Sequence, residues 1–160
     1  MSRLLVAAFY AFTPLDDDQR EALLNALPPL ACEGDVLGSV LVAKEGVNGT
    51  ITGPEQGVEA LLEHLQQQLT LGEQHFERLE VKRSWAERSV FRRFKARHKK
   101  EIVTMGVAGV DPRANVGTYV DPERWNALVE DPDTLVIDTR NHYETAIGSF
   151  DGEGFGYFPA

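Results

Sequence analysis

The sequence predicts an α+β protein, with a β-α-β-β-α-β unit followed by a shorter, partial α/β unit. Two observations predict the first unit. Two segments have the periodicity of helices, and short runs typical of strands flank each of them. A third observation divides the chain, because residues 108–117 contain the glycine, proline and asparagine typical of a linker. Only 43 residues follow, from 118 to 160, which is fewer than an independent α/β domain usually has.

The chain begins with a strand and a helix. Residues 4–12 form a continuous apolar run, which predicts a buried strand that ends at Thr13-Pro14. Residues 16–27 predict a helix, with acidic residues in its first turn where they suit the helix dipole. We expect Pro28-Pro29 to end this helix, because proline lacks the N–H that continues it.

A hairpin and a second helix complete the first unit. Residues 36–43 predict a strand, and Asn48-Gly49 predicts a hairpin turn into a short strand at 50–52. A helix begins at Gly53-Pro54-Glu55, with an apolar stripe at Val58, Leu61, Leu62, Leu65 and Leu69. Residues 76–82 predict the fourth strand, and 101–107 a further one. The order is that of a ferredoxin-like (acylphosphatase-like) domain, which we place at 1–107.

The second unit, 118–160, has a helix-then-strand pattern. Asp121 and Pro122 are suited to the start of a helix, and residues 135–137 predict a buried strand. Asp138 and Arg140 follow that strand at its carboxyl end, where α/β folds place functional groups, although a structural ion pair explains them equally well.

Composition excludes several classes of function. The chain is 42% hydrophobic and 26% charged, which is typical of globular proteins, and no apolar run reaches the roughly 20 residues that span a membrane. We therefore expect no membrane partner. Cys32 is the only cysteine, so no internal disulfide or multi-cysteine metal site forms, and a reducing, cytoplasmic setting fits best. The four histidines lack metal-ligand spacing, so we expect no metal.

The charge is unevenly distributed. The net charge is −9, yet residues 82–100, the basic block, hold nine lysines or arginines and one acidic residue. Trp85, Phe91 and Phe94 are interleaved with these cations, a pattern suited to phosphate contact and base packing. The alternatives are a solvated basic segment without function and a contact with an acidic protein surface.

Several stretches together resemble the bacterial rhodanese-domain tRNA uridine 5-hydroxylases. They are Phe9-Tyr10-Ala11-Phe12, residues 43–50 (AKEGVNGT), residues 97–104 (RHKKEIVT), Gly117-Thr118-Tyr119, and residues 136–144 (VIDTRNHYE) with Ile147-Gly148-Ser149-Phe150. The resemblance covers about the first 150 residues. It implies a ferredoxin-like domain at 1–107, a linker at 108–117 and the incomplete start of a rhodanese domain at 118–160.

The resemblance also implies an activity, which is oxygen-dependent 5-hydroxylation of the wobble uridine of tRNA by an oxidoreductase. The essential cysteine of the family lies in a rhodanese loop beyond Gly148, so we expect no catalytic residue here, and Cys32 does not inherit that role. No cofactor is evident beyond the molecular oxygen that the family uses. Asp138 and Arg140 are then rhodanese framework residues, and we expect the incomplete unit to offer a surface for self-association.

We therefore expect tRNA as the partner of the basic block. The candidate nucleic-acid-binding residues are Arg88, Arg92, Arg93, Lys95, Arg97, Lys99, Lys100, Lys44 and Asn48. The alternative is a non-enzymatic interaction domain whose basic segment meets an acidic protein. A strongly salt-dependent preference for tRNA would distinguish the two.

Overall fold

The computed structural model describes residues 3–70, 79–102, 117–138, 140 and 142–148, and the backbone of 155–157. The chain divides into two compact units, Met1–Arg113 and Ala114–Ala160, and each is described by itself. The predicted linker at 108–117 lies outside the described residues except for Gly117. No described helix is long and apolar enough to cross a membrane.

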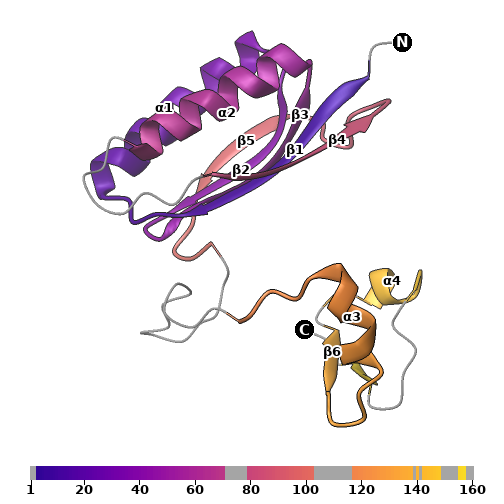
Figure 1. The fold of residues 1–160 in the computed structure, drawn as a ribbon. Helices are drawn as coiled ribbons and strands as arrows, with labels where there is room; N and C mark the ends of the chain where they lie inside the picture. The colour runs from indigo at the N-terminus through magenta and orange to yellow at the C-terminus, as the bar shows by residue number, and fades with distance from the viewer. Residues whose placement is uncertain are drawn as a thin grey trace. The chain divides into compact units, whose positions relative to one another are not determined.

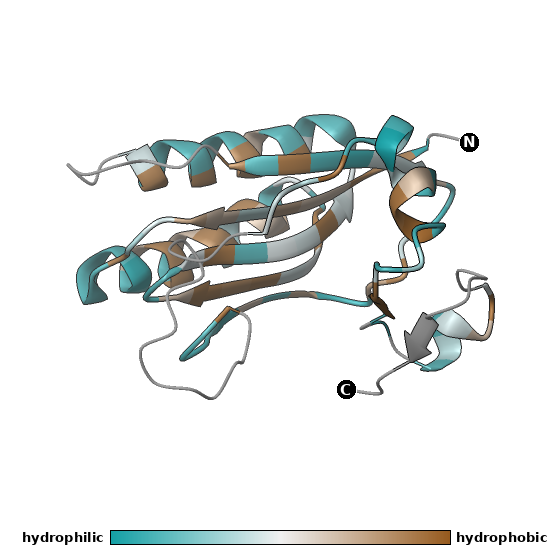
Figure 2. Ribbon diagram, turned by 60° about the horizontal axis from the view of Figure 1, so that its bottom comes forward, coloured by the Kyte–Doolittle hydropathy of each residue, from teal (hydrophilic) through white to brown (hydrophobic). Residues whose placement is uncertain are grey.

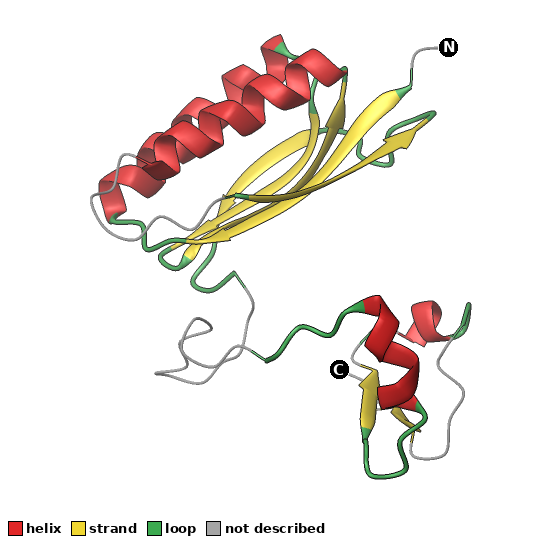
Figure 3. Ribbon diagram, viewed as in Figure 1, coloured by secondary structure: helices red, strands yellow, loops and turns green. Residues whose placement is uncertain are grey.

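The first unit has two layers, a sheet and a pair of helices. Its strands are β1 (Leu4–Phe12), β2 (Leu37–Ala43), β3 (Gly46–Gly53), β4 (Glu80–Ala86) and β5 (Phe94–His98), in the spatial order β4-β1-β3-β2-β5. Helices α1 (Asp17–Glu33) and α2 (Glu55–Thr70) lie on the same face of this sheet (Figures 1 and 3). The first four strands confirm the ferredoxin-like fold, and β5 adds an edge strand parallel to β2.

The core lies between the helices and one face of the sheet. All five residues of the predicted stripe on α2 are buried, and Figure 2 shows this banding of apolar and polar residues along both long helices. Strand β1 is buried on one face only, because Leu5, Ala7, Phe9 and Ala11 face the core while the residues between them are at least partly exposed. The continuous apolar run therefore did not reveal that core-facing residues of this strand alternate with partly exposed ones.

Helix α1 ends later in the chain than predicted. It does not end at Pro28-Pro29 but continues through both prolines to Glu33. Leu23, Leu27 and Ala31 are spaced four residues apart and are all fully buried. Burial of this stripe offsets the two lost backbone hydrogen bonds, so tertiary packing overrides the local signal.

The turn of the β2–β3 hairpin also differs from its predicted position. The turn lies at Lys44-Glu45, while Asn48 and Gly49 lie within β3, paired with Leu41 and Val40 of β2. Gly46 supplies the unusual backbone, since its φ is 139° and a Cβ there would lie 1.9 Å from the Ala11 carbonyl oxygen. The Asn-Gly pair was therefore a misleading turn signal.

The edge strands differ from prediction as well. The fourth strand lies at Glu80–Ala86 rather than 76–82, and a strand that was not predicted forms at Phe94–His98, within the basic block. Residues 76–78 and 103–107 of the predicted strands lie outside the described residues.

The second unit contains α3 (Pro122–Val129), β6 (Val136–Asp138), α4 (His142–Thr145) and β7 (Phe155–Tyr157), with β6 parallel to β7. Pro122 starts α3 as predicted, although the Asp121 side chain makes no capping hydrogen bond. The strand predicted to be buried is not, because Leu135 is 64% and Ile137 52% exposed. Asp138 is the one buried side chain among the described residues of this unit.

Candidate nucleic-acid interface

The basic block spans both edges of the sheet. It begins in β4, crosses the end of the sheet through residues 87–93 and returns along β5. Its exposed cations thus include Arg88 in this connection, Arg92 and Arg93 just before β5, and Lys99 and Lys100 after its end. Residues 93–99 of an extended chain cover about 20 Å. The cations therefore form a strip along this edge, which we call the cation strip: Arg92, Arg93, Lys95, Arg97 and Lys99.

Strand β5 is anchored from both sides. The Gly38 amide donates to the Arg93 carbonyl oxygen at 3.3 Å, and the Lys99 amide to the Val42 carbonyl oxygen at 2.9 Å. On the helix side, the buried Arg20 of α1 contacts the ring of His98 and pairs with Asp17. The cation strip is therefore held on a fixed edge of the fold.

The pleat of β5 decides where its cations point. Lys95 pairs with Ser39 and Arg97 with Leu41, on the sheet face opposite the helices, whereas Phe94 and Ala96 pack against the core. The neighbouring cations Arg93 and Arg97 lower the pKa of Lys95. Because like charges lower the pKa of an amine, this shift records a concentration of positive charge that a bound phosphate would relieve.

Lys44 and Asn48 extend the candidate site differently. Lys44 is exposed in the β2–β3 turn, at the same end of the sheet as Lys99. Asn48 is half-buried on the helix-free face, where it lies opposite Tyr10 of β1. The structure thus brings both residues to the sheet end or face that carries the cation strip.

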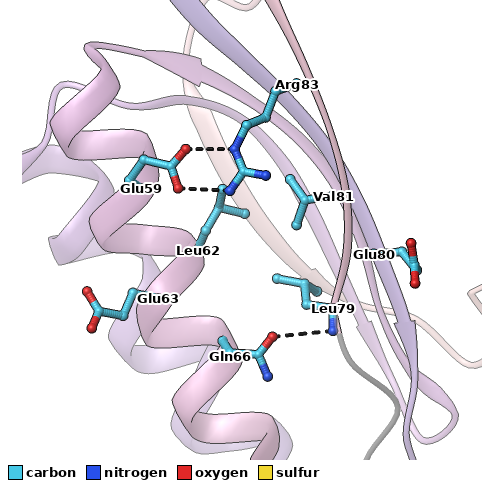
Figure 4. A pocket seen from close by; sticks show the side chains of 8 residues that line it. All are labelled: Glu59, Leu62, Glu63, Gln66, Leu79, Glu80, Val81 and Arg83. Carbon is cyan, nitrogen blue, oxygen red and sulfur yellow. Dashed lines mark hydrogen bonds and ion pairs between the residues drawn. The ribbon is translucent and has the colours of Figure 1, made fainter.

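Arg83 belongs to the basic block but not to this strip. Its Nε and Nη2 atoms donate to the two carboxylate oxygens of Glu59 on α2, at 2.7 and 2.9 Å (Figure 4). This double hydrogen bond lowers the pKa of Glu59 and raises that of Arg83. The pair borders a hollow of about 450 Å³ between α2 and β4, which Glu63 also lines. The carboxylates of Glu59 and Glu63 make it unsuitable for phosphate, whereas the Glu80 side chain points away from α2 (Figure 4).

The three interleaved aromatic residues are not equivalent. Phe94 packs against the core, Phe91 is half-buried, and Trp85 is 51% exposed but is paired with Leu5, which faces the core. The sequence did not single out Tyr10, Phe12 or Lys82 as candidate binding residues, although all three lie on the helix-free face with Lys95. Side chains alternate between the two faces of a strand, so Tyr10 and Phe12 of β1 must share one face. That spacing was the sequence signal that could have indicated an aromatic pair there.

In the second unit, Asp138 and Arg140 form an ion pair. Arg140 Nη2 lies 2.6 Å from Asp138 Oδ2 and also donates to the Gly148 carbonyl oxygen at 2.9 Å. Hydrogen bonds from the Arg140 side chain and amide lower the pKa of Asp138. The pair therefore ties the end of β6 to the segment after α4.

Cys32 is exposed near the end of α1. Among the described residues, no group of three or more histidine, cysteine, aspartate or glutamate side chains is placed to hold a metal ion.

A protein-family model described as UPF0176 acylphosphatase like domain matches residues 4–102. The chain belongs to the UPF0176 family. Its relatives include two proteins named tRNA uridine(34) hydroxylase. The one from Parasynechococcus marenigrum (strain WH8102) is 90% identical over 152 residues, covering 95% of this chain and 47% of the relative. The one from Synechococcus sp. (strain CC9605) is 70% identical over 164 residues, covering 99% and 50%.

These relatives confirm the family resemblance, and the chain spans about half of their length. Among solved structures, an acylphosphatase from Coxiella burnetii matches with a TM-score of 0.43 and 14% identity, covering 59% of this chain and 94% of that one. A bacterial light-regulated adenylyl cyclase matches with a TM-score of 0.47 and 10% identity, covering 61% and 28%. Likenesses this low carry no argument about activity.

Proposed function

We propose that this chain is the tRNA-contacting part of a tRNA uridine(34) hydroxylase of the UPF0176 family. The observation that carries the proposal is the cation strip along β5, where Arg92, Arg93, Lys95, Arg97 and Lys99 follow one edge of the sheet. Exposed lysines and arginines bind nucleic acid by displacing counterions from phosphates. The names of the relatives suggest that the nucleic acid is tRNA. The positive charge of the strip suggests how the tRNA is bound.

The reaction proposed for the whole enzyme is 5-hydroxylation of the wobble uridine with molecular oxygen, in the cytoplasm. We place no residue of this chain in the chemical step, so its role is to bind the substrate. Asp138 and Arg140 are proposed as framework residues of a rhodanese unit, because their ion pair fixes the segment ending at Gly148.

The test compares tRNA binding by the chain and by a variant with Arg92, Arg93, Lys95 and Lys99 changed to glutamate. These side chains do not belong to the core, so the variant should keep the thermal unfolding midpoint within a few degrees. We expect its tRNA affinity to fall at least a hundredfold at moderate salt, since each lost phosphate contact also becomes a repulsion.

Unchanged tRNA affinity in the folded variant would reject the interface. Tighter binding of acidic proteins than of tRNA by the unaltered chain would instead favour the interaction-domain alternative. Incubating tRNA with the 160-residue chain in air should yield no 5-hydroxyuridine, and formation of this product would refute the proposed catalytic silence.

A further inference from the structure

The helix-free face of the sheet carries an aromatic ring beside an amide. Tyr10 of β1 is 37% exposed there, and Asn48 lies directly opposite on β3. Opposite residues on antiparallel strands have Cβ atoms about 5 Å apart, so the two side chains are neighbours. Arg97 lies in the same row across the sheet, three strand spacings or about 14 Å from Tyr10.

The ring of Tyr10 packs against a second aromatic ring. Its centroid lies 6.0 Å from that of Phe12 in an edge-to-face arrangement at 61°, a favourable geometry for two aromatic rings. Ala8, two residues earlier on the same face, is exposed and small. The tyrosine is thus braced by Phe12, with open space over Ala8.

Charged residues surround this aromatic position. Lys82 of β4 pairs with Ala8, and Lys95 of β5 lies further along the same row, so two cations flank the open space. Glu80 pairs with Tyr10 itself and would repel a phosphate placed beside the ring. The charge pattern therefore favours phosphates near the lysines and an uncharged group over Tyr10.

We propose that this face binds an unpaired nucleotide of RNA, whose base stacks on Tyr10 and hydrogen-bonds to Asn48 while Lys82, Lys95 and Arg97 contact the backbone. An amide both donates and accepts, as the edge of a base does. Bases of double-stranded RNA are stacked inside the helix and cannot reach the ring, so the ligand is single-stranded. This inference rests on the proposed function and deepens it, by assigning a base-binding position to the tRNA-contacting surface.

The experiment measures binding of the 160-residue chain to a fluorescent eight-nucleotide oligouridylate at two salt concentrations. We expect Tyr10→Ala to weaken binding about ten- to a hundredfold and by the same factor at both salts, because base stacking is not a charge interaction. Tyr10→Phe keeps the ring and should bind within about twofold of the unaltered chain. Trp85→Ala is the matched control, an exposed aromatic residue of the same sheet that is paired with core-facing Leu5, and should have no effect.

The outcomes separate this inference from the proposed function. If Tyr10→Ala binds normally while the four-glutamate variant does not, the cation strip stands and the base-binding position is refuted. If neither variant changes binding, both proposals fail. A second measurement needs no variant: an oligonucleotide containing 5-bromouridine should crosslink to Tyr10 on irradiation, and crosslinks confined to the opposite face would overturn the inference.

Discussion

Arg83 and Arg97 show how one residue type acquires two roles within one basic block. Arg83 pairs with Ala7, which faces the core, and reaches Glu59, whereas Arg97 pairs with Leu41 on the helix-free face and is exposed. The sequence predicted both as cations of one block. It could not assign their faces, because the face depends on strand boundaries and register that are set by tertiary packing.

The Glu59–Arg83 pair makes stability depend on pH. Folding lowers the pKa of Glu59, so the pair stabilises the protein above the unfolded pKa, about 4.3, and this contribution disappears as the pH falls through the lower folded pKa. Both side chains are more than 40% exposed, so Glu59→Gln should lower the free energy of unfolding by only about 0.5 kcal/mol at pH 7.

Urea unfolding of the unaltered chain and of Glu59→Gln, measured in steps from pH 7 downward, tests this dependence. The two curves should converge at acid pH, where the carboxyl is protonated. A difference that persists or grows at acid pH would show that the pair does not act through the charge of Glu59.

The elements differ from prediction where the core overrides local signals. The stripe on α2 predicted its helix correctly, because the same residues that form the pattern also fill the core. In α1, the core stripe continues past two prolines, and in β3 an Asn-Gly pair lies within a strand. Such exceptions were not predictable from short windows, since their compensation comes from residues distant in sequence.

Gly49 illustrates this compensation within β3. A Cβ at this position would lie 2.7 Å from Phe9 Cζ and 2.7 Å from the Ser39 carbonyl oxygen. Gly49→Val should therefore lower the free energy of unfolding by about 2–3 kcal/mol, because the fully buried Phe9 ring has no room to move. Thr50→Val, at the neighbouring half-buried position of β3, is the control and should cost less than about 1 kcal/mol. Equal effects of the two variants in denaturant unfolding would refute this packing argument.

At the scale of the whole molecule, the two units differ in how they bury apolar surface. The first has a continuous core, whereas Trp125, Leu135, Ile137 and Tyr143 of the second are all exposed by more than a third. These exposed apolar side chains are the basis for expecting contact with another polypeptide. Self-association through the second unit stays a prediction, which sedimentation of the chain would test.

Hydrogen exchange should reveal the same contrast. We expect the amides of Val40, Val47 and Ile51, buried in the sheet, to exchange at least about a hundredfold more slowly than those of Leu128 and Ile137, because local opening is easiest where few apolar contacts hold the backbone. Comparable protection in both units would mean that the second has a closed core of its own.

The salt dependence of tRNA binding tests most directly whether this chain binds tRNA through the cation strip. With about six cations on phosphates, the slope of log K against log salt should be about −4 to −5. Arg97→Gln should make this slope shallower by about 0.7–0.9, the share of one phosphate contact. Arg83→Gln, which removes the same charge from the other face, should leave it unchanged. A slope near zero, or equal changes in the two variants, would contradict the account.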